Sequence, residues 1–325
     1  MELIPGLIDD IGLECLVKVP YHYFSSVNSV CQRWKLQMEL PQFRQRRTEA
    51  GMTQHDSTRS GTWMELPPIH EYLDGLPMFC QLVGVGLNLV VMGGWNPVTW
   101  EVTNAVFVYN FVTAKWRQGD DIPGCWRSFF ACASDFEQMV FVAGGHDDEK
   151  SALRSALAYD VAKDEWIPLP DMARERDECK GVFNNGKFHV IGGYHTNMQG
   201  RFENSAETFD VSNWRWDEVQ EQFLETAMCP RTCVDGGDGR LYICHDSGIA
   251  AVDNCTFDNV AELPTDLRIT SYVTGFKGKL LVIGSTGFNE QQRCWVLDLR
   301  THKWTRIESV EGFTGHVQSG CCLEL

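Results

Sequence analysis

Residues 139–145 read MVFVAGG, residues 156–160 read ALAYD, and Trp166 stands six residues after Asp160. An apolar run that ends in two glycines is thus followed by a second apolar run that ends in an aromatic–acid pair, and then by a tryptophan. The four copies of this order are Gly93-Gly94, Tyr109-Asn110 and Trp116; Gly144-Gly145, Tyr159-Asp160 and Trp166; Gly192-Gly193, Phe209-Asp210 and Trp216; and Gly284, Leu297-Asp298 and Trp304. Self-similarity at a period of roughly 50 residues predicts a radial array of small sheets, because one copy alone cannot bury both of its faces.

Each copy has the pattern of four short strands. In the second copy, apolar runs cover residues 129–133, 139–143 and 156–159, and Trp166 opens a fourth run. Four consecutive strands per repeat are typical of a propeller blade. Glycine suits the end of the second strand because neighbouring blades leave no room for a Cβ atom there. The tryptophan would fill the wedge between adjacent sheets, so we expect these residues to be structural.

The number of blades follows from counting strands. Only five second strands are visible, and Cys244-His245 replaces the diglycine in the most divergent copy. We therefore predict a mainly β protein, a β-propeller of six blades whose incomplete last blade is closed by residues 317–325 beside the Trp63 strand. A ring of five blades is the alternative. The last strands that give a count of six would begin at Trp63, Trp116, Trp166, Trp216, Phe257 and Trp304.

The acidic character of the chain limits the classes of partner that it is expected to bind. The net charge is −16, and residues 1–50 contribute nothing to it, so the repeats carry all of the excess acid. Polyanions are bound by Lys and Arg that displace counterions, so we expect neither nucleic acid nor an anionic membrane as a partner. No apolar stretch reaches the roughly 18 residues of a membrane span, and no secretory signal is visible. These features predict a protein of the cytoplasm or nucleus whose 13 cysteines are mostly buried, reduced thiols.

Patterns that carry catalysis are missing from the sequence. It contains no phosphate-binding loop with its lysine, no Gly-x-Ser-x-Gly elbow, and no His-x-x-x-His pair among its nine histidines. We therefore expect no catalytic residue, no metal site and no cofactor.

The first 45 residues differ from the repeats. Apolar residues recur there at helical spacing, first from Ile8 to Leu16 and again from Val27 to Trp34. We expect three short helices in residues 1–45, an exposed polar linker at 46–62, and the propeller at 63–325. A segment of this size has too little core to be very stable alone.

Both regions resemble known families. The repeats from about residue 63 to 325 resemble kelch repeats, and the N-terminal segment resembles an F-box. The F-box likeness rests on Pro5, Asp10, Leu16, Val19, Pro20, Val30, Cys31 and Trp34. It implies docking of apolar anchors into a Skp1-type adaptor of a cullin-based ubiquitin ligase. The anchors it implies are Ile4, Pro5, Leu7, Ile8, Leu16, Val19, Pro20, Val30, Cys31 and Trp34. The alternative is a small helical cap packed on the propeller.

Joined in one chain, the two regions resemble the short F-box/kelch receptors of plants. This resemblance implies a non-catalytic receptor that brings a folded protein to the ligase for ubiquitination and proteasomal degradation. The substrate that it implies first is phenylalanine ammonia-lyase, and hence phenylpropanoid biosynthesis. Chalcone synthase and cytokinin response regulators are the alternatives, and a ligase-independent kelch scaffold is the rival function.

Loops that leave the diglycines and loops that precede each first strand should emerge on one face, which we predict to bind the substrate. For Trp95, packing against a neighbouring blade and contact with a partner are equally open. An arginine also recurs about 16 residues before the end of each second strand, so four arginines could form a basic ring, or each could pair with an acid nearby. The predicted substrate-binding residues are Trp95, Asn96, Trp100, Trp126, Arg127, His146, Arg174, Arg176, Tyr194, His195, Arg231 and Arg268.

Overall fold

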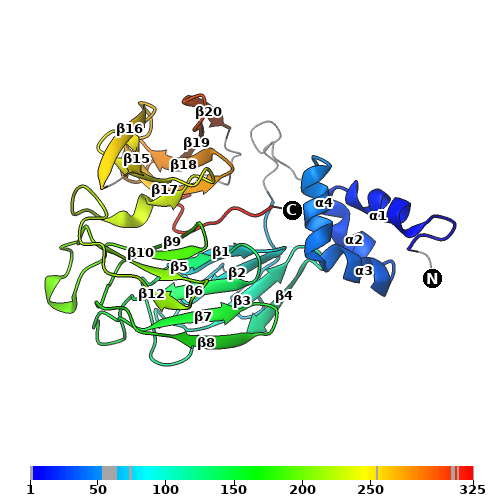
Figure 1. Ribbon diagram of the computed structural model, residues 1–325, viewed down its shortest axis with the longest axis horizontal. Coiled ribbons are helices and arrows are strands. Elements are labelled where there is room, and N and C mark those ends of the chain that lie inside the picture. The colour runs from blue at the N-terminus through cyan, green and yellow to red at the C-terminus, as the bar shows by residue number, and fades with distance from the viewer. Residues whose placement is uncertain are drawn as a thin grey trace.

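A computed structural model of the chain describes residues 3–52, 64–72, 75–253, 255–308, 312 and 315–324. It contains five antiparallel sheets, each made of four strands that are consecutive in the chain, and we call them blades 1 to 5 (Figure 1). Blade 1 has β1 (Gln81–Val85), β2 (Asn88–Met92), β3 (Val106–Asn110) and β4 (Lys115–Gly119); blade 2 has β5 (Ala131–Ser134), β6 (Met139–Ala143), β7 (Ala156–Asp160) and β8 (Glu165–Leu169). Blade 3 has β9 (Lys180–Asn184), β10 (Lys187–Ile191), β11 (Ala206–Asp210) and β12 (Arg215–Trp216). Blade 4 has β13 (Val234–Asp235), β14 (Leu241–His245), β15 (Gly248–Asp253) and β16 (Thr256–Glu262); blade 5 has β17 (Ile269–Phe276), β18 (Lys279–Ser285), β19 (Arg293–Asp298) and β20 (Lys303–Ile307).

The first strands of the blades surround a central channel. β1 contacts β5, β5 contacts β9, β9 contacts β13 and β13 contacts β17, so the blades follow one another around a ring. The apolar core is divided into layers between neighbouring blades, such as the layer of Val83, Val108, Val140 and Tyr159 between blades 1 and 2. Burial between sheets, and not within one, is what an array of repeats requires.

The repeated tryptophans join successive blades, as their spacing predicts. Each indole Nε1 donates a hydrogen bond to a backbone carbonyl of the preceding segment, at 2.6 to 2.9 Å. The pairs are Trp116 with Pro67, Trp166 with Asp120, Trp216 with Pro170 and Trp304 with Glu262. In blade 4, Phe257 holds the corresponding place at the start of β16. The ring therefore combines apolar wedges with one directed polar contact at each tryptophan.

The diglycines are needed for their backbone conformation. Gly94 has φ +98°, and a Cβ atom there would lie 2.7 Å from the carbonyl oxygen of Met78. Gly145 and Gly193 have similar φ values of +80° and +84° in blades 2 and 3. A larger residue would meet both strain and collision at these positions.

Six blades, the predicted number, is wrong: the ring has five. Residues 315–324 form no strand, and Trp63, beside which they were expected to lie, falls outside the described residues. The segment runs instead between β1 and β17, where Figure 1 shows it in red. Ser319 Oγ accepts a hydrogen bond from Leu82 N at 3.2 Å, and the hydroxyl of Tyr272 donates to Gly320 O. The segment closes the ring mainly through side chains, so it adds no blade.

Residues 3–52 form a helical module beside blade 1. It has four α-helices, where three were expected: α1 (Asp9–Val17), α2 (Phe24–Asn28), α3 (Gln32–Glu39) and α4 (Pro41–Glu49). The described chain also has three short 3₁₀ turns. One lies in this module, η1 (Tyr21–Tyr23), and two lie in the propeller, η2 (Thr196–Met198) and η3 (Pro230–Thr232). None of the helices in the described ranges is long and apolar enough to cross a membrane.

The extra helix contains a buried arginine at a position that was predicted to lie in an exposed linker. Arg47 donates hydrogen bonds to the carbonyl oxygens of Val17 and Val19, both at 2.6 Å, and lies over the ring of Phe24. Burial lowers the pKa of Arg47. The predicted boundary at residue 45 thus falls inside α4, and residues 53–62 of the predicted linker lie outside the described residues.

The helical module and the propeller share one apolar cluster. Leu87 in the β1–β2 turn and Val112 in the β3–β4 turn pack with Phe24, Met38 and Phe43 of the helices. Both turns lie at the end of blade 1 opposite to the diglycine, because β1 and β2 are antiparallel. We call this side of the ring the hairpin face and the other side the diglycine face.

Candidate functional site

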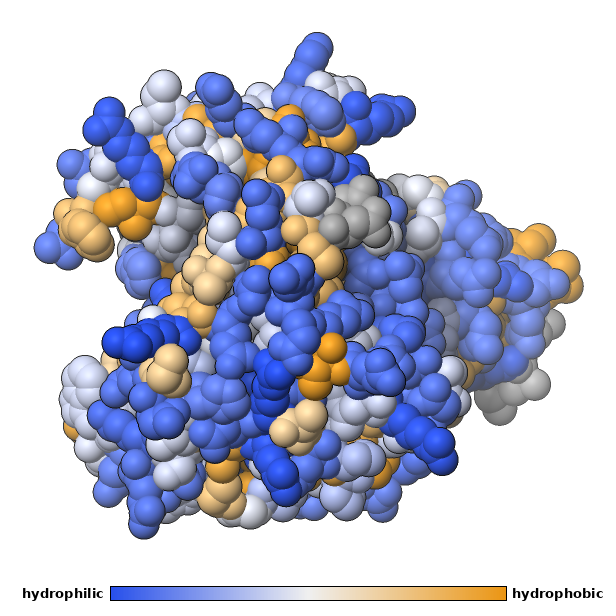
Figure 2. All heavy atoms as spheres, turned by 60° about the vertical axis from the view of Figure 1, so that its left-hand side comes forward, coloured by the Kyte–Doolittle hydropathy of each residue, from blue (hydrophilic) through white to orange (hydrophobic). Residues whose placement is uncertain are grey.

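Several predicted adaptor anchors are exposed apolar side chains on the helical module. Ile8 is 68 % exposed and Val30 is 61 % exposed, and Pro5 and Cys31 are also exposed. Ile11 and Leu36 add further apolar area that the predictions did not include. Figure 2 shows hydrophobic residues gathered at the outer end of this module, away from the propeller. We call Pro5, Ile8, Val30 and Cys31 the helical patch.

One predicted anchor lies in the core. Leu16 is 2 % exposed and packs in the cluster of Phe24, Met38 and Phe43, so it supports the helices and presents no side chain to a partner. The spacing of Leu16 and Ile8 placed both on one amphipathic helix, but it did not show which side faces the neighbouring helices. Ile4, Leu7, Val19 and Trp34 are half-buried, and Pro20 is exposed.

The loop before α1 is fixed to α3. Asp9 accepts hydrogen bonds from Leu3 N at 2.7 Å and from the Arg33 guanidinium at 2.6 Å. The hydrogen bond from Leu3 N holds the pKa of Asp9 below its usual value, and the ion pair with Arg33 acts in the same direction. Trp34 Nε1 donates to Leu3 O at 2.6 Å. The loop that carries Pro5 and Ile8 is thereby held in a defined position before any partner binds.

On the diglycine face, the two exposed tryptophans differ from the others. Trp100 is 62 % exposed with φ +61°, and Trp126 is 53 % exposed. Trp95 is half-buried, and its Nε1 donates to Ser128 Oγ at 3.0 Å in the next blade, so it serves blade packing. Asn96 accepts hydrogen bonds from Val98 N and Thr99 N and shapes its own loop.

The four recurrent arginines form no ring. Arg127 and Arg176 are 2 % and 1 % exposed, whereas Arg231 and Arg268 are exposed. Arg127 donates to the carbonyl oxygens of Gly144 and Ser155 at 2.9 and 3.0 Å, and so ties the segment before β5 to both ends of the β6–β7 loop. None of the described residues pairs a carboxylate with this guanidinium, and burial lowers the pKa of Arg127. The basic ring is therefore corrected to two structural and two surface arginines.

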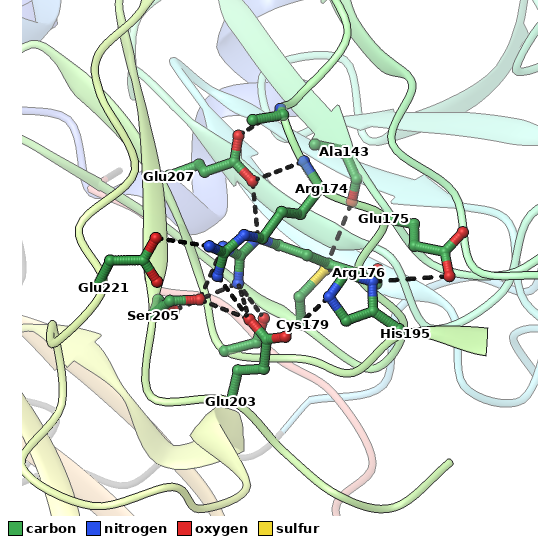
Figure 3. A network of polar contacts seen from close by, with 12 residues as sticks. Ala143, Arg174, Glu175, Arg176, Cys179, His195, Glu203, Ser205, Glu207 and Glu221 are labelled. Atoms are coloured by element: carbon green, nitrogen blue, oxygen red, sulfur yellow. Dashed lines mark hydrogen bonds and ion pairs between the residues drawn. The ribbon is translucent and has the colours of Figure 1, made fainter. Parts of the chain in front are cut away.

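In blade 3 a buried arginine again binds the loop between the second and third strands, and here carboxylates also contact it (Figure 3). Arg176 donates to Gly192 O at 2.8 Å and to Ser205 Oγ at 2.9 Å, and its Nε lies 3.1 Å from the buried Glu207. Arg174 reaches Glu203 at 3.3 Å and Glu221 at 2.5 Å. Both arginines of this network are therefore paired with glutamate carboxylates.

The predicted histidines and tyrosine also have partners within the protein. His146 Nδ1 lies 2.9 Å from Asp177, and His195 Nε2 lies 2.8 Å from Glu203. Tyr194 is buried and donates its hydroxyl to Glu178 at 2.8 Å. These side chains order the loops of the face, which leaves Trp100, Trp126, Arg231 and Arg268 as its exposed members.

The channel opens on the diglycine face in a cavity of about 170 Å³, which we call the channel mouth. Phe79, Phe129, Lys180 and Arg231 are among the residues that line it, and the first three do not follow from any repeat signal used above. Residues 316–320 form one wall. Within the described part of the chain, no group of three or more His, Cys, Asp or Glu side chains is arranged to hold a metal.

Comparison with known proteins agrees with both modules. The Kelch motif family matches residues 79–121 and 136–173. The F-box/kelch-repeat protein At1g80440 of Arabidopsis thaliana is 43 % identical, and At1g15670 of the same plant is 42 % identical, each over 100 % of both chains. The F-box/kelch-repeat protein At2g44130, also from Arabidopsis thaliana, is 34 % identical over 72 % of this chain and 69 % of its own. With a helical module on one face of a kelch ring, and relatives of this identity along its whole length, this chain belongs to the F-box/kelch-repeat proteins.

Proposed function

We propose that this protein is the substrate-recognition subunit of an SCF-type ubiquitin ligase. The observation that carries the proposal is that the helical module packs on the hairpin face of the ring, while the exposed tryptophans belong to the loops of the diglycine face. The helical module shares its core with Leu87 and Val112 on the hairpin face, and the residues of its helical patch are exposed. Trp100 and Trp126 lie with the loops of the other face.

This arrangement supports a mechanism of proximity. The helical patch offers apolar anchors of the kind that dominate protein–protein binding energy. The rigid ring would hold a folded target at a fixed distance from the adaptor and its cullin, which raises the effective concentration of target lysines near the ubiquitin carrier. No residue of this chain has to break or form a covalent bond in that role. The setting we propose is the cytoplasm or nucleus.

For the target, the resemblance to plant receptors favours phenylalanine ammonia-lyase, with chalcone synthase and cytokinin response regulators as alternatives. The test is affinity purification of the tagged full chain from plant cells, with and without a proteasome inhibitor. We expect a Skp1-type adaptor and a cullin in both eluates, and phenylalanine ammonia-lyase enriched on inhibition. An eluate without adaptor contradicts the ligase role, and a target whose abundance ignores the inhibitor favours a scaffold.

A further inference from the structure

The channel mouth contains two cations that are left without acids. Lys180 at the start of β9 and Arg231 in η3 both line it, and neither side chain makes a hydrogen bond or ion pair with any residue that the structure describes. Lys180 is half-buried, and burial lowers the pKa of its ammonium group. Cations withdrawn from water are ordinarily paired, so Lys180 is an exception within a chain of net charge −16, and the exposed Arg231 adds a second positive charge at the same mouth.

The acids closest to this site along the chain are engaged elsewhere. Glu178 also lines the mouth, but its carboxylate accepts the hydroxyl of Tyr194 at 2.8 Å. Asp177 is held by His146 at 2.9 Å. By contrast, Arg174 and Arg176, which precede β9 in the chain, both have carboxylate partners. The acids near Lys180 in the chain are thus held by other side chains, which leaves the two cations of the mouth available to a ligand.

Two aromatic side chains also line the mouth. Phe79 and Phe129 stand just before β1 and β5, with ring centroids 5.5 Å apart, and Phe79 remains 40 % exposed. Their φ values are +57° and +51°, and Glu178 before β9 has φ +48°. Bulky residues seldom adopt this conformation, which costs on the order of 1–3 kcal/mol and concentrates at ligand sites. Three successive blades therefore hold side chains at the mouth at a cost in backbone strain.

We propose that the channel mouth binds a short segment of the target protein in which an acidic residue adjoins an aromatic or aliphatic one. The carboxylate lies between Lys180 and Arg231, and the apolar side chain packs on Phe79 and Phe129. The inference deepens the proposed function and rests on it, since it names the part of the receptor that reads the target. Charge complementarity favours an acidic segment, and a cavity of about 170 Å³ has room for one or two side chains.

The test uses the purified full chain in complex with its Skp1-type adaptor. A phage-displayed library of random peptides is selected on this complex, and the enriched peptides are synthesised with a fluorescent label for polarisation titrations. We expect enrichment of sequences that place Asp or Glu next to Phe, Tyr, Trp or Leu. Lys180→Met and Arg231→Ala should each weaken peptide binding about tenfold or more, because a hydrogen-bonded charge is lost. Phe79→Ala should weaken it too.

Matched controls separate this effect from a general change in charge. Lys115→Met in β4 and Arg306→Ala in β20 remove one charge each on outermost strands, and they should leave peptide binding unchanged. Thermal melting checks that the Lys180 and Arg231 variants remain folded. Enriched peptides without acids, or equal affinity in the Lys180 and Arg231 variants, would overturn the proposal while adaptor binding stands. Loss of adaptor binding by the wild-type chain would instead remove the proposed function.

Discussion

The buried arginine of blade 3 offers a sharp test of whether the recurrent arginines are structural. Arg176 loses four hydrogen bonds when it is changed to methionine, to Gly192 O, Ser205 O, Ser205 Oγ and Glu207. Glu207 is itself buried and would be left with backbone donors only, from Ala173 and Arg174. Removing one partner of a buried ion pair costs about 3–5 kcal/mol, because the remaining charge stays out of water.

Arg127→Met is the internal comparison. This variant loses the hydrogen bonds to two carbonyl oxygens and one hydroxyl, but it leaves no buried carboxylate without its partner. We therefore expect a smaller loss in the free energy of unfolding, about 1–3 kcal/mol. Arg268→Met removes an exposed side chain and should change the free energy of unfolding by less than about 0.5 kcal/mol. The expected order of destabilisation is therefore Arg176, then Arg127, then Arg268.

Urea unfolding of the full chain, followed by tryptophan fluorescence, measures these differences. A double-mutant cycle with Glu207→Gln isolates the ion pair, and we expect the double variant to be more stable than the sum of its single changes predicts. If Arg176→Met unfolds at the same urea concentration as wild type, the structural role assigned to the arginine is refuted. The same result would reopen the basic ring as a recognition surface.

Three further predictions concern the helices, the pH dependence and the closure of the ring. Ile8→Glu with Val30→Glu should abolish adaptor capture without changing the melting temperature, because both side chains are exposed, whereas Leu16→Ala should cost about 2–5 kcal/mol; pull-down and thermal melting distinguish the two. Burial lowers the pKa of His189 from 6.5 to about 4, so the contribution of its neutral form to the free energy of unfolding is fully present above pH 6.5. That contribution falls by up to about 3 kcal/mol as the pH drops toward 4. A His189→Gln variant whose unfolding free energy, measured in urea, kept the wild-type dependence on pH would argue against this. Gly275→Ala would drive a Cβ into the carbonyl of Asp235 between blades 4 and 5 and should cost about 1–3 kcal/mol or more, while Gly315→Ala, with open space around it, should cost little; equal melting temperatures would contradict the inter-blade packing.

Features with a strict local requirement could be predicted from the sequence. The diglycines need positive φ and lack room for a Cβ, and the tryptophans must reach across to the previous blade, so their order and spacing located blades 1, 2, 3 and 5. The blade count failed at the ends of the chain. There the last apolar segment resembles a strand by composition, but in the structure residues 315–324 form no strand and close the ring through side chains.

The candidate site was harder to predict because its character depends on burial. Arg127 and Arg231 occupy comparable positions in the repeat pattern, yet one is buried and bonded to carbonyl oxygens while the other is exposed. Leu16 likewise could not be separated from Ile8 by helical spacing. Lys180 carried no signal at all, since a lysine at the start of a strand ordinarily reaches solvent; its place in the channel follows only from the closing of the ring.

Reciprocal capture tests the two-surface account most directly. The full chain, its Ile8→Glu/Val30→Glu variant and its Trp100→Ala/Trp126→Ala variant are purified from cells treated with a proteasome inhibitor, and bound adaptor and target are quantified. We predict that the helical-patch variant loses adaptor and retains target, while the tryptophan variant loses target and retains adaptor. Loss of both partners by either folded variant, or of neither, would contradict a receptor with separate surfaces for ligase and target.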